Sequence, residues 1–341
     1  MSIVEIAKQA GVSISTVSRY FNQPDKVSHD AAGRIRAVTT RLNYQPDIRR
    51  PGPKTSERVG IKTGTIAFLS LGDYAPEKML KMPAFPVLLG SIQRTLIERQ
   101  LSLLLAHLDP GSGNIPGCID PRFCDGVILF GRDDRPGLKE KLVRKLGELP
   151  AVWCFREHCD EERRFDHILY DNRAVGAIAA EYLAGRGHRK AAVFNTDPTH
   201  GAFTVRVPTF RKRAEELGME VREFVSSGRG GDIDRYRELA DAFRQEGAGV
   251  TGAFFCADDI MLGVCNELRA GGTPVDELDS IGCNADEVLL RYLSPRPATI
   301  DIKMAQVGEM AVLHLLRRIN SERNGYSSEI FIKPELVKGD R

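Results

Sequence analysis

The residues with the clearest chemical potential lie near the start of the chain, where short hydroxyl side chains surround one arginine. Residues 14–22 read ISTVSRYFN. Small hydroxyls approach phosphates and base edges closely, and a single arginine can donate two hydrogen bonds to the O6 and N7 atoms of guanine. The pattern is typical of a helix that enters the major groove of DNA.

Three short helices are expected to position these residues. Ser2 and Glu5 have the spacing of a capping box, and Gly11 is placed to end the first helix in a left-handed conformation. Ser13 and Ser28 can cap a second and a third helix. Two helices joined by a glycine-containing turn and closed by a third predict a helix-turn-helix unit over residues 1–46. The expected inward-facing side chains are Ile3, Ile6, Ala7, Ala10, Val17, Phe21, Ile35, Val38 and Leu42.

The charge distribution separates this head from the rest of the chain. The 341 residues carry a formal net charge of +2, but residues 1–62 hold eleven Lys/Arg against five Asp/Glu, a net of +6. The remainder holds 37 basic and 41 acidic residues, a net of −4. This imbalance indicates a head that binds a polyanion, with chance clustering of charges as the alternative.

Composition limits the class of protein. With 42% hydrophobic and 28% charged residues, the chain has the composition of an ordinary globular protein. No run approaches the ~18–20 apolar residues of a membrane helix, and the N-terminus resembles no signal peptide. The seven scattered cysteines are typical of a reducing compartment. We therefore expect a cytoplasmic protein without membrane contact.

The head resembles the headpiece of the lactose/galactose repressor family of transcriptional regulators. The matching segments are residues 6–13 (IAKQAGVS), 15–19 (STVSR), Asn22, 27–28 (VS) and 43–46 (NYQP). The resemblance implies that the recognition helix reads bases through Ile14, Ser15 and Arg19, and for Ile14 a half-buried core position is the alternative. The residues implied as mainly backbone contacts are Thr16, Ser18, Asn22 and Lys26.

Residues 47–64 form a basic linker in which the chain departs from the family pattern. That family usually has a short hinge helix here, which wedges a leucine into the minor groove. Pro53 stands at the leucine position, and two prolines flanking a glycine forbid a regular helix. Arg49, Arg50 and Lys54 instead resemble extended arms that lie in A·T-rich minor grooves. A solvated linker that merely attracts phosphates is the alternative.

From residue 65 onward, short apolar runs alternate with helical patterns, which predicts an open parallel α/β sheet. A break near Tyr170 predicts two lobes, mainly 65–170 and mainly 171–300, with the chain crossing back near 301–341. Such sheets bind ligands beyond the carboxyl ends of their strands, here between the lobes. The expected strands are 65–71, 102–106, 125–130, 151–155, 190–195, 251–256 and 279–283. The expected helices are 86–99, 136–147, 172–186, 203–217, 233–246, 258–270 and 303–319.

This body resembles the ligand core of the same family, which is similar in fold to periplasmic binding proteins. The matching segments are 171–172 (DN), 187–189 (GHR), Arg206 with Phe210, 257–261 (ADDIM), 280–284 (SIGCN), 299–301 (TID) and 334–337 (PELV). The resemblance implies that Arg206, Asp258 and Asn284 hold a small-molecule effector. The family more often has Asn at 258, Gly at 209 and Asp at 284.

The chemistry of these side chains suits a sugar or a related polyol. A guanidinium and short carboxylate or amide groups can bind vicinal hydroxyls, while aromatic rings pack on the apolar face of the sugar. Phe85, Trp153 and Phe155 are candidates for that packing, and ordinary core packing is the alternative for each.

Other chemistry finds little support. Cys154, His158, Cys159 and His167 are close in sequence, but their spacing fits no structural zinc site. Dinucleotide, P-loop and nucleophile-elbow motifs are absent from the sequence, so no cofactor, metal or catalytic residue is expected.

These patterns predict an all-α helix-turn-helix headpiece followed by a two-lobed α/β core. We expect a transcriptional repressor, not an enzyme, that binds a pseudo-palindromic operator as a homodimer and responds to an effector between its lobes. A solute-binding protein without specific DNA recognition and an α/β enzyme are the alternatives. Salt-sensitive binding to a specific duplex would distinguish the regulator from both.

Overall fold

The computed structural model divides into two compact units, Met1–Lys54 and Thr55–Arg341. The residues that it describes are 3–22, 24–42, 60–72, 74–80, 82, 84–109, 111, 114–131, 137–147, 149–155, 165–228, 231–291, 293–321 and 327–340. Ser2, the 43–46 motif and the predicted linker contacts Arg49, Arg50 and Lys54 lie outside the described residues.

The N-terminal unit is the expected helical bundle. Its elements are α1 (Ile3–Ala10), α2 (Ile14–Asn22), the short 3-10 helix η1 (Pro24–Lys26) and α3 (His29–Arg41). Ile6, Val17 and Ile35, one from each α-helix, are fully buried at its centre. Because the three helices share one small apolar core, the opposite face of each is left to solvent.

Local capping fixes the ends of these helices as the sequence predicts. Gly11 has a φ of +62°, the left-handed conformation that ends α1. The Ser13 hydroxyl accepts a hydrogen bond from the backbone N–H of Thr16 at 3.1 Å, which caps α2. The Ser28 hydroxyl accepts from the N–H of Ala31 at 3.4 Å and caps α3. These three capping predictions are confirmed, whereas the capping box of Ser2 and Glu5 stays a prediction because Ser2 lies outside the described residues.

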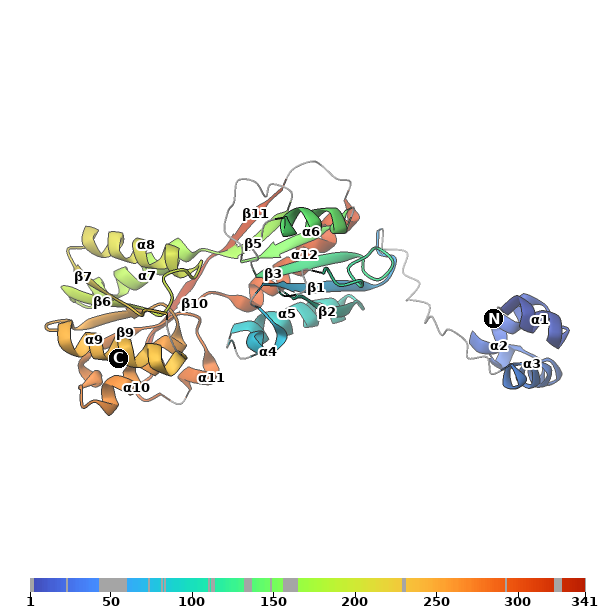
Figure 1. The fold of residues 1–341 in the computed structure, drawn as a ribbon, viewed down its shortest axis with the longest axis horizontal. Coiled ribbons are helices and arrows are strands. Elements are labelled where there is room, and N and C mark those ends of the chain that lie inside the picture. The colour runs from blue at the N-terminus through green and yellow to red at the C-terminus, as the bar shows by residue number, and fades with distance from the viewer. Residues whose placement is uncertain are drawn as a thin grey trace. The chain divides into compact units, whose positions relative to one another are not determined.

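The second unit has two lobes, and the first (the N-lobe) is built on a parallel sheet of six strands in the order β11-β5-β4-β3-β1-β2. Helices cover it on both sides (Figure 1). The elements are β1 (Thr65–Leu71), α4 (Pro76–Met79), α5 (Ala84–Glu98), β2 (Ser102–Leu108), β3 (Gly126–Gly131), α6 (Leu138–Leu146), β4 (Ala151–Cys154), β5 (Asp166–Tyr170), α12 (Met304–Asn320) and β11 (Glu329–Ile332).

The strands of the N-lobe are apolar on both faces because each face is covered. In β1, Ile66 and Phe68 pack in the core layer beneath α5 and α12. The neighbouring Ala67 and Leu69 pack in the layer that includes residues of α6. This explains the continuous apolar run in the sequence, which is typical of a buried parallel strand.

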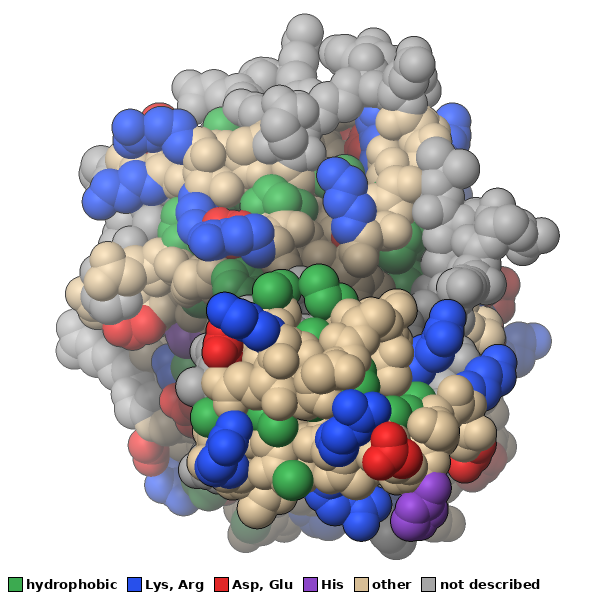
Figure 2. All heavy atoms as spheres, turned by 90° about the vertical axis from the view of Figure 1, so that its right-hand side faces the viewer, with side chains coloured by type: hydrophobic (Ala, Val, Ile, Leu, Met, Phe, Trp, Pro, Cys, Tyr) green, Lys and Arg blue, Asp and Glu red, His purple; other side chains and the backbone are tan. Residues whose placement is uncertain are grey.

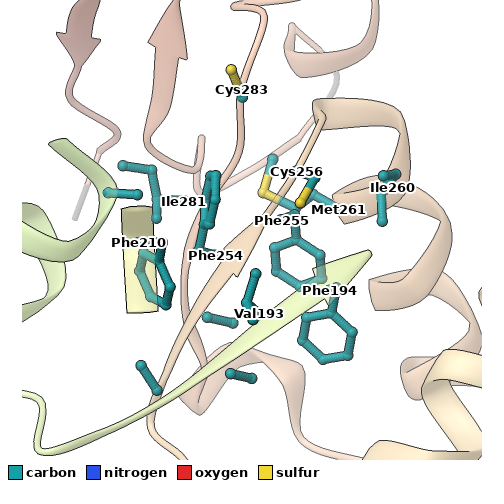
Figure 3. Packing of buried hydrophobic residues seen from close by; sticks show 14 of the residues in the cluster. Val193, Phe194, Phe210, Phe254, Phe255, Cys256, Ile260, Met261, Ile281 and Cys283 are labelled. Carbon is teal, nitrogen blue, oxygen red and sulfur yellow. The ribbon is translucent and has the colours of Figure 1, made fainter. Parts of the chain in front are cut away.

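The second lobe (the C-lobe) has a parallel sheet in the order β7-β6-β8-β9 and an antiparallel pair, β10-β12. Consecutive residues of β8 serve opposite faces: Phe255 stacks on Phe194 at 4.6 Å between ring centroids, whereas Phe254 packs against Phe210 at 5.1 Å (Figure 3). The elements are α7 (Asn172–Gly185), β6 (Lys190–Asn195), α8 (Phe203–Glu216), β7 (Glu220–Val225), α9 (Asp232–Glu246), β8 (Gly252–Phe255), α10 (Asp258–Ala270), η3 (Val275–Glu277), β9 (Asp279–Ile281), α11 (Glu287–Leu290), β10 (Thr299–Asp301) and β12 (Glu335–Val337).

The chain passes between the lobes three times. It leaves the N-lobe after β5, returns between β10 and α12, and leaves again between β11 and β12. The sequence predicts the first two passages but not the third. It also misses β5, β7, β10, β11 and β12 as strands, whereas the boundaries of β1, β6 and α10 match the prediction residue for residue.

Asp125 fixes the segment that leads into β1. Its buried carboxylate accepts hydrogen bonds from the backbone N–H groups of Lys62, Thr63, Gly64 and Thr65, at distances from 2.7 to 3.3 Å, and from the Thr63 hydroxyl at 2.9 Å. One carboxyl side chain thus accepts hydrogen bonds from four consecutive backbone N–H groups. The core end of the linker is therefore held at a defined place.

Replacing Asp125 with Ala should destabilise the core strongly. Four backbone N–H groups lose their acceptor, so the free energy of unfolding should fall by about 3 kcal/mol. Urea unfolding of Asp125→Ala measures this, with the exposed Glu215→Gln as a control expected to change little. A loss below about 1 kcal/mol would show that water replaces the carboxylate without cost.

Candidate nucleic-acid interface and effector site

The predicted DNA-contacting residues lie on the open face of α2. Ile14 is 52% exposed, and Ser15 and Arg19 are also exposed, whereas Thr16 and Ser18 are half-buried. Val17, on the opposite face, is completely buried. An isoleucine so exposed at the first turn of a helix is no core residue, which removes the alternative reading of Ile14. Its contact with a base remains a prediction.

The hydroxyls at the start of α2 are linked to one another. The Ser13 hydroxyl lies 2.7 Å from that of Ser15 and 2.8 Å from that of Thr16. Three hydroxyls have three hydrogens, and the two internal contacts use two of them, so one hydrogen remains that can donate to a phosphate oxygen.

The charges around α2 are mainly positive. The described helices of the head hold six Lys/Arg, all exposed, against three Asp/Glu. Figure 2, in which this unit faces the viewer, shows blue basic side chains spread over its surface. Lys26 is exposed on η1, and Asn22 is the last residue of α2, although its side chain lies outside the described atoms. This face has the electrostatics of a phosphate-binding surface.

In the core, Arg206 is the residue around which the predicted effector site is organised. Its side chain is 1% exposed and donates three hydrogen bonds. Nε donates to Oδ1 of Asn172 at 2.8 Å, Nη1 to the carbonyl oxygen of Cys256 at 2.6 Å, and Nη2 to the hydroxyl of Tyr170 at 3.2 Å. Tyr170 ends β5 of the N-lobe and Cys256 follows β8 of the C-lobe, so this guanidinium joins the two lobes.

Local sequence explains how Arg206 reaches these partners. Asp171 caps α7 by accepting from the N–H groups of Arg173 and Ala174, which places Asn172 in the first turn. Gly176 then allows α8 to approach, because a Cβ there would lie 2.5 Å from the carbonyl oxygen of Arg206. The close α7–α8 packing thus sets the distance between Arg206 and Asn172.

Aromatic rings surround the same guanidinium. Its central carbon lies 5.4 Å from the Tyr170 ring centroid and 5.9 Å from that of Phe203, within the range of cation–π attraction. Phe155, one of the predicted packing residues, contacts Tyr170 at 5.3 Å and Phe130 at 5.6 Å between centroids. Its φ of +64° is unusual for a bulky residue and is typical of a functional site.

The other two predicted aromatics lie in the N-lobe core. Phe85 is 3% exposed and packs against Phe68 and Phe130. Trp153 is 1% exposed, belongs to the layer on the α6 side of the sheet, and donates its indole N–H to the carbonyl of Gly131 at 2.9 Å. Both positions are those of ordinary core residues, so direct contact of either ring with an effector has no structural support.

Asp258 is fully buried at the start of α10. Its Oδ1 accepts from the Thr299 hydroxyl at 2.7 Å, and its Oδ2 accepts from the backbone N–H of Asp286 at 2.8 Å. Burial raises the pKa of this carboxyl to about 7. Both oxygens are engaged by the protein itself, so Asp258 acts first as a link between β10 and the segment that begins α11.

Asn284 follows β9 at the same edge of the sheet and is half-buried. Its backbone N–H donates to the carbonyl of Ile300 at 2.9 Å, and its φ is +108°. Asn tolerates positive φ better than most residues, which suits this backbone conformation.

Three contributors were missed in the sequence. The sequence marks Tyr170 only as the boundary between the lobes and Asn172 only as part of the 171–172 motif, although both accept a hydrogen bond from Arg206. His200, in the loop after β6, stacks on Phe203 with 4.3 Å between ring centroids, and its buried Nδ1 has no hydrogen-bond partner among the described residues. Burial lowers the pKa of this imidazole, and the nearby charge of Arg206 lowers it further. A lone histidine in a loop gives no signal in the sequence.

Elsewhere in the C-lobe, a cavity of about 90 Å3 lies between α10 and the loop after α11, lined among others by Met261, Cys265 and Arg296. It contains none of the predicted effector residues.

The described residues offer no group of three or more His, Cys, Asp or Glu side chains arranged to bind a metal. Cys154 and His167 are both buried, and His158 and Cys159 lie outside the described residues. Within the same part of the chain, no helix has the length and apolar character needed to span a membrane.

Comparison with known protein families finds a match in each of the two units. Residues 2–47 match the model of bacterial regulatory proteins of the lacI family, and residues 180–340 match that of a periplasmic binding protein-like domain. The chain is 25% identical to the ribose operon repressor of Haemophilus influenzae, over 98% of this chain and 96% of that one. It is also 25% identical to the transcriptional repressor PurR of Histophilus somni, over 98% and 97% of the two chains.

Solved structures share the same fold. The Lac repressor dimer bound to operator and an anti-inducer has a TM-score of 0.69 at 17% identity, covering 99% of this chain and 98% of that one. A complex of the regulator CelR with cellobiose has a TM-score of 0.66 at 20% identity, covering 100% and 99%.

The head and the two-lobed core therefore define a DNA-binding regulator with a ligand-binding body. The chain combines a DNA-binding head of the bacterial lacI regulatory family with a periplasmic binding protein-like domain.

Replacing Asp258 with asparagine should alter the pH dependence of stability. Because the pKa of Asp258 in the folded protein lies above its ordinary value, its contribution to stability is full below about pH 4 and is lost as the pH rises through about 7. The amide introduced by Asp258→Asn does not titrate and can bond to the same partners. Urea unfolding should show the variant gaining stability relative to wild type as the pH rises from about 4 to about 7, with no further gain above that raised pKa. If the difference in the free energy of unfolding between wild type and Asp258→Asn stays constant with pH, the pKa of Asp258 is not raised in the folded protein.

Proposed function

We propose that this protein is a cytoplasmic transcriptional repressor that binds a pseudo-palindromic operator as a homodimer and is regulated by a sugar or sugar derivative. The exposed, hydroxyl-rich and basic face of α2 carries the DNA-binding part of this proposal. Two such heads would occupy major grooves about 10 base pairs apart, or a multiple of that spacing. The Lac repressor, similar in fold, is a dimer on its operator.

The effector part rests on Arg206. A ligand that binds between the lobes must compete with or join the acceptors that this guanidinium now has on both lobes. A change in those bonds changes the lobe arrangement, and by linkage it must alter DNA affinity as much as DNA alters ligand affinity. A family member of Enterococcus faecium, 18% identical with a TM-score of 0.66, holds ribose, and CelR holds cellobiose.

Selection from random duplexes tests the regulatory function. The purified protein should enrich a palindrome, with an A·T-rich centre if Arg49 and Arg50 enter the minor groove. Repeating the selection with a panel of sugars should change the amount of DNA retained. Binding that is only non-specific and salt-labile under every condition would favour a solute-binding protein instead.

Arg19→Ala should weaken binding to the selected palindrome by tenfold or more and relax the preference at one base pair of each half-site, since a bidentate contact contributes about 1–3 kcal/mol. Fluorescence anisotropy against the palindrome and a scrambled duplex measures this. Arg41→Gln is the control. Arg41 is the last residue of α3 and donates a hydrogen bond to Gln9 of α1, so its replacement should leave the preferred DNA sequence unchanged. If Arg19→Ala keeps full discrimination, Arg19 does not read bases.

A further inference from the structure

We propose that the cavity between α10 and the loop after α11 is a second binding site, which takes a small uncharged molecule with an apolar body and a carbonyl oxygen. The cavity has a volume of about 90 Å3 and contains no residue of the predicted effector site. The site is therefore separate from the effector site, and its existence does not depend on the proposed function.

The walls of the cavity are largely apolar. Met261 and Leu262 line it from α10, Leu278 lies just before β9, and Leu293 and Ala298 belong to the loop after α11. Water finds few hydrogen-bond partners on such walls, whereas an apolar cavity of about 150 Å3 can hold a benzene ring. A cavity of about 90 Å3 thus suits a smaller apolar body.

Two hydroxyls that line the cavity are already engaged, whereas one buried donor is not. The hydroxyl of Tyr182 donates to Oδ1 of Asp279 at 3.4 Å, and that of Ser280 donates to the carbonyl oxygen of Leu278 at 3.2 Å. Nε of Arg296 is buried and has no hydrogen-bond partner among the described residues. A guanidinium N–H donates and never accepts, so the group that satisfies it is an acceptor such as a carbonyl oxygen.

The charges around the cavity favour an uncharged ligand. The charged residues that line it are two arginines and two aspartates, Arg269, Arg296, Asp276 and Asp279. Each has an opposite charge nearby: Arg269 lies 4.0 Å from Asp276, Arg296 lies 2.5 Å from Glu287, and Asp279 pairs with Arg186. A carboxylate or an ammonium group on the ligand would lose hydration here without gaining a free counter-charge.

Cys265 provides a reporter inside the cavity. It lines the cavity from α10 and is half-buried, so a small reagent can reach it. Cys118 is also half-buried but lies in the loop between β2 and β3 of the N-lobe, and it serves as the internal reference. A ligand in the cavity should slow the alkylation of Cys265 and leave that of Cys118 unchanged.

Three probes that share one five-membered ring test the ligand class. Cyclopentanone carries a carbonyl oxygen, cyclopentylammonium carries only donors, and cyclopentanecarboxylate carries a negative charge. The full chain is treated with iodoacetamide at constant ionic strength, and each cysteine is followed by peptide mass spectrometry. Cyclopentanone at about twice its Kd should slow the alkylation of Cys265 about threefold, in proportion to occupancy. The two charged probes should leave the rate unchanged.

Variants locate the effect. Arg296→Lys keeps the positive charge but has no donor at the position of Nε, so cyclopentanone should lose most of its protection of Cys265. Leu293→Trp should fill the cavity and slow the alkylation with or without a probe. Arg213→Lys makes the same exchange in α8, outside the cavity, where the arginine pairs with Glu181 and Glu216. This control should keep the full protection.

A second measurement needs no reaction at Cys265. Met261 lines the cavity, so its 13C-labelled methyl signal, assigned with Met261→Leu, should shift when cyclopentanone is added. The same signal should stay in place with the two charged probes.

Three results would overturn the proposal. The first is that no probe protects Cys265 or shifts the Met261 signal. The second is that a charged probe acts as strongly as cyclopentanone, which would contradict the ligand class. The third is that Cys265 becomes protected as the protein concentration rises without any probe, which would assign the cavity to a contact with a second copy of the chain.

Discussion

The buried guanidinium of Arg206 is the interaction on which the architecture of the core depends. It donates to the end of β5 in one lobe and to the end of β8 in the other, and it contacts two aromatic rings. Such a group is costly to bury and strongly directional, so a small change in its partners has a large energetic effect. The sequence around it, with a capping Asp171 and the small Gly176, serves to hold it at that junction.

A second fixed point lies at the other end of the N-lobe sheet. Arg206 bonds to the end of β5, whereas Asp125 holds the segment that leads into β1. By binding four successive backbone N–H groups, it makes the start of β1 and the end of the linker one rigid structure. The head has its own small apolar core and forms a separate compact unit.

The sequence predicts the elements of this protein better than it predicts its site. Capping residues such as Ser13 and Ser28, and the long apolar runs of β1 and β6, are local signals and were identified correctly. The short strands β7, β11 and β12 carry alternating or exposed residues and gain their structure from pairing with distant strands, so they gave no local signal.

The same distinction applies to individual site residues. Arg206 was identified because a motif marks it, whereas Trp153 was offered as a ligand contact although its indole serves the core. The sequence cannot show which face of a sheet a side chain occupies when both faces are apolar. His200 and Tyr170 join the site through tertiary packing between segments far apart in the chain.

If the bonds of Arg206 couple effector binding to operator affinity, a substitution that changes these bonds should abolish the response to the effector. The most direct measurement is the operator affinity of wild type and of Arg206→Lys, with and without the panel ligand that raises Tm most. Lysine keeps the charge but lacks the planar set of donors. Arg206→Lys should still bind the selected palindrome but should no longer respond to the ligand. A variant that responds as wild type does would show that the lobes are coupled to DNA by another route.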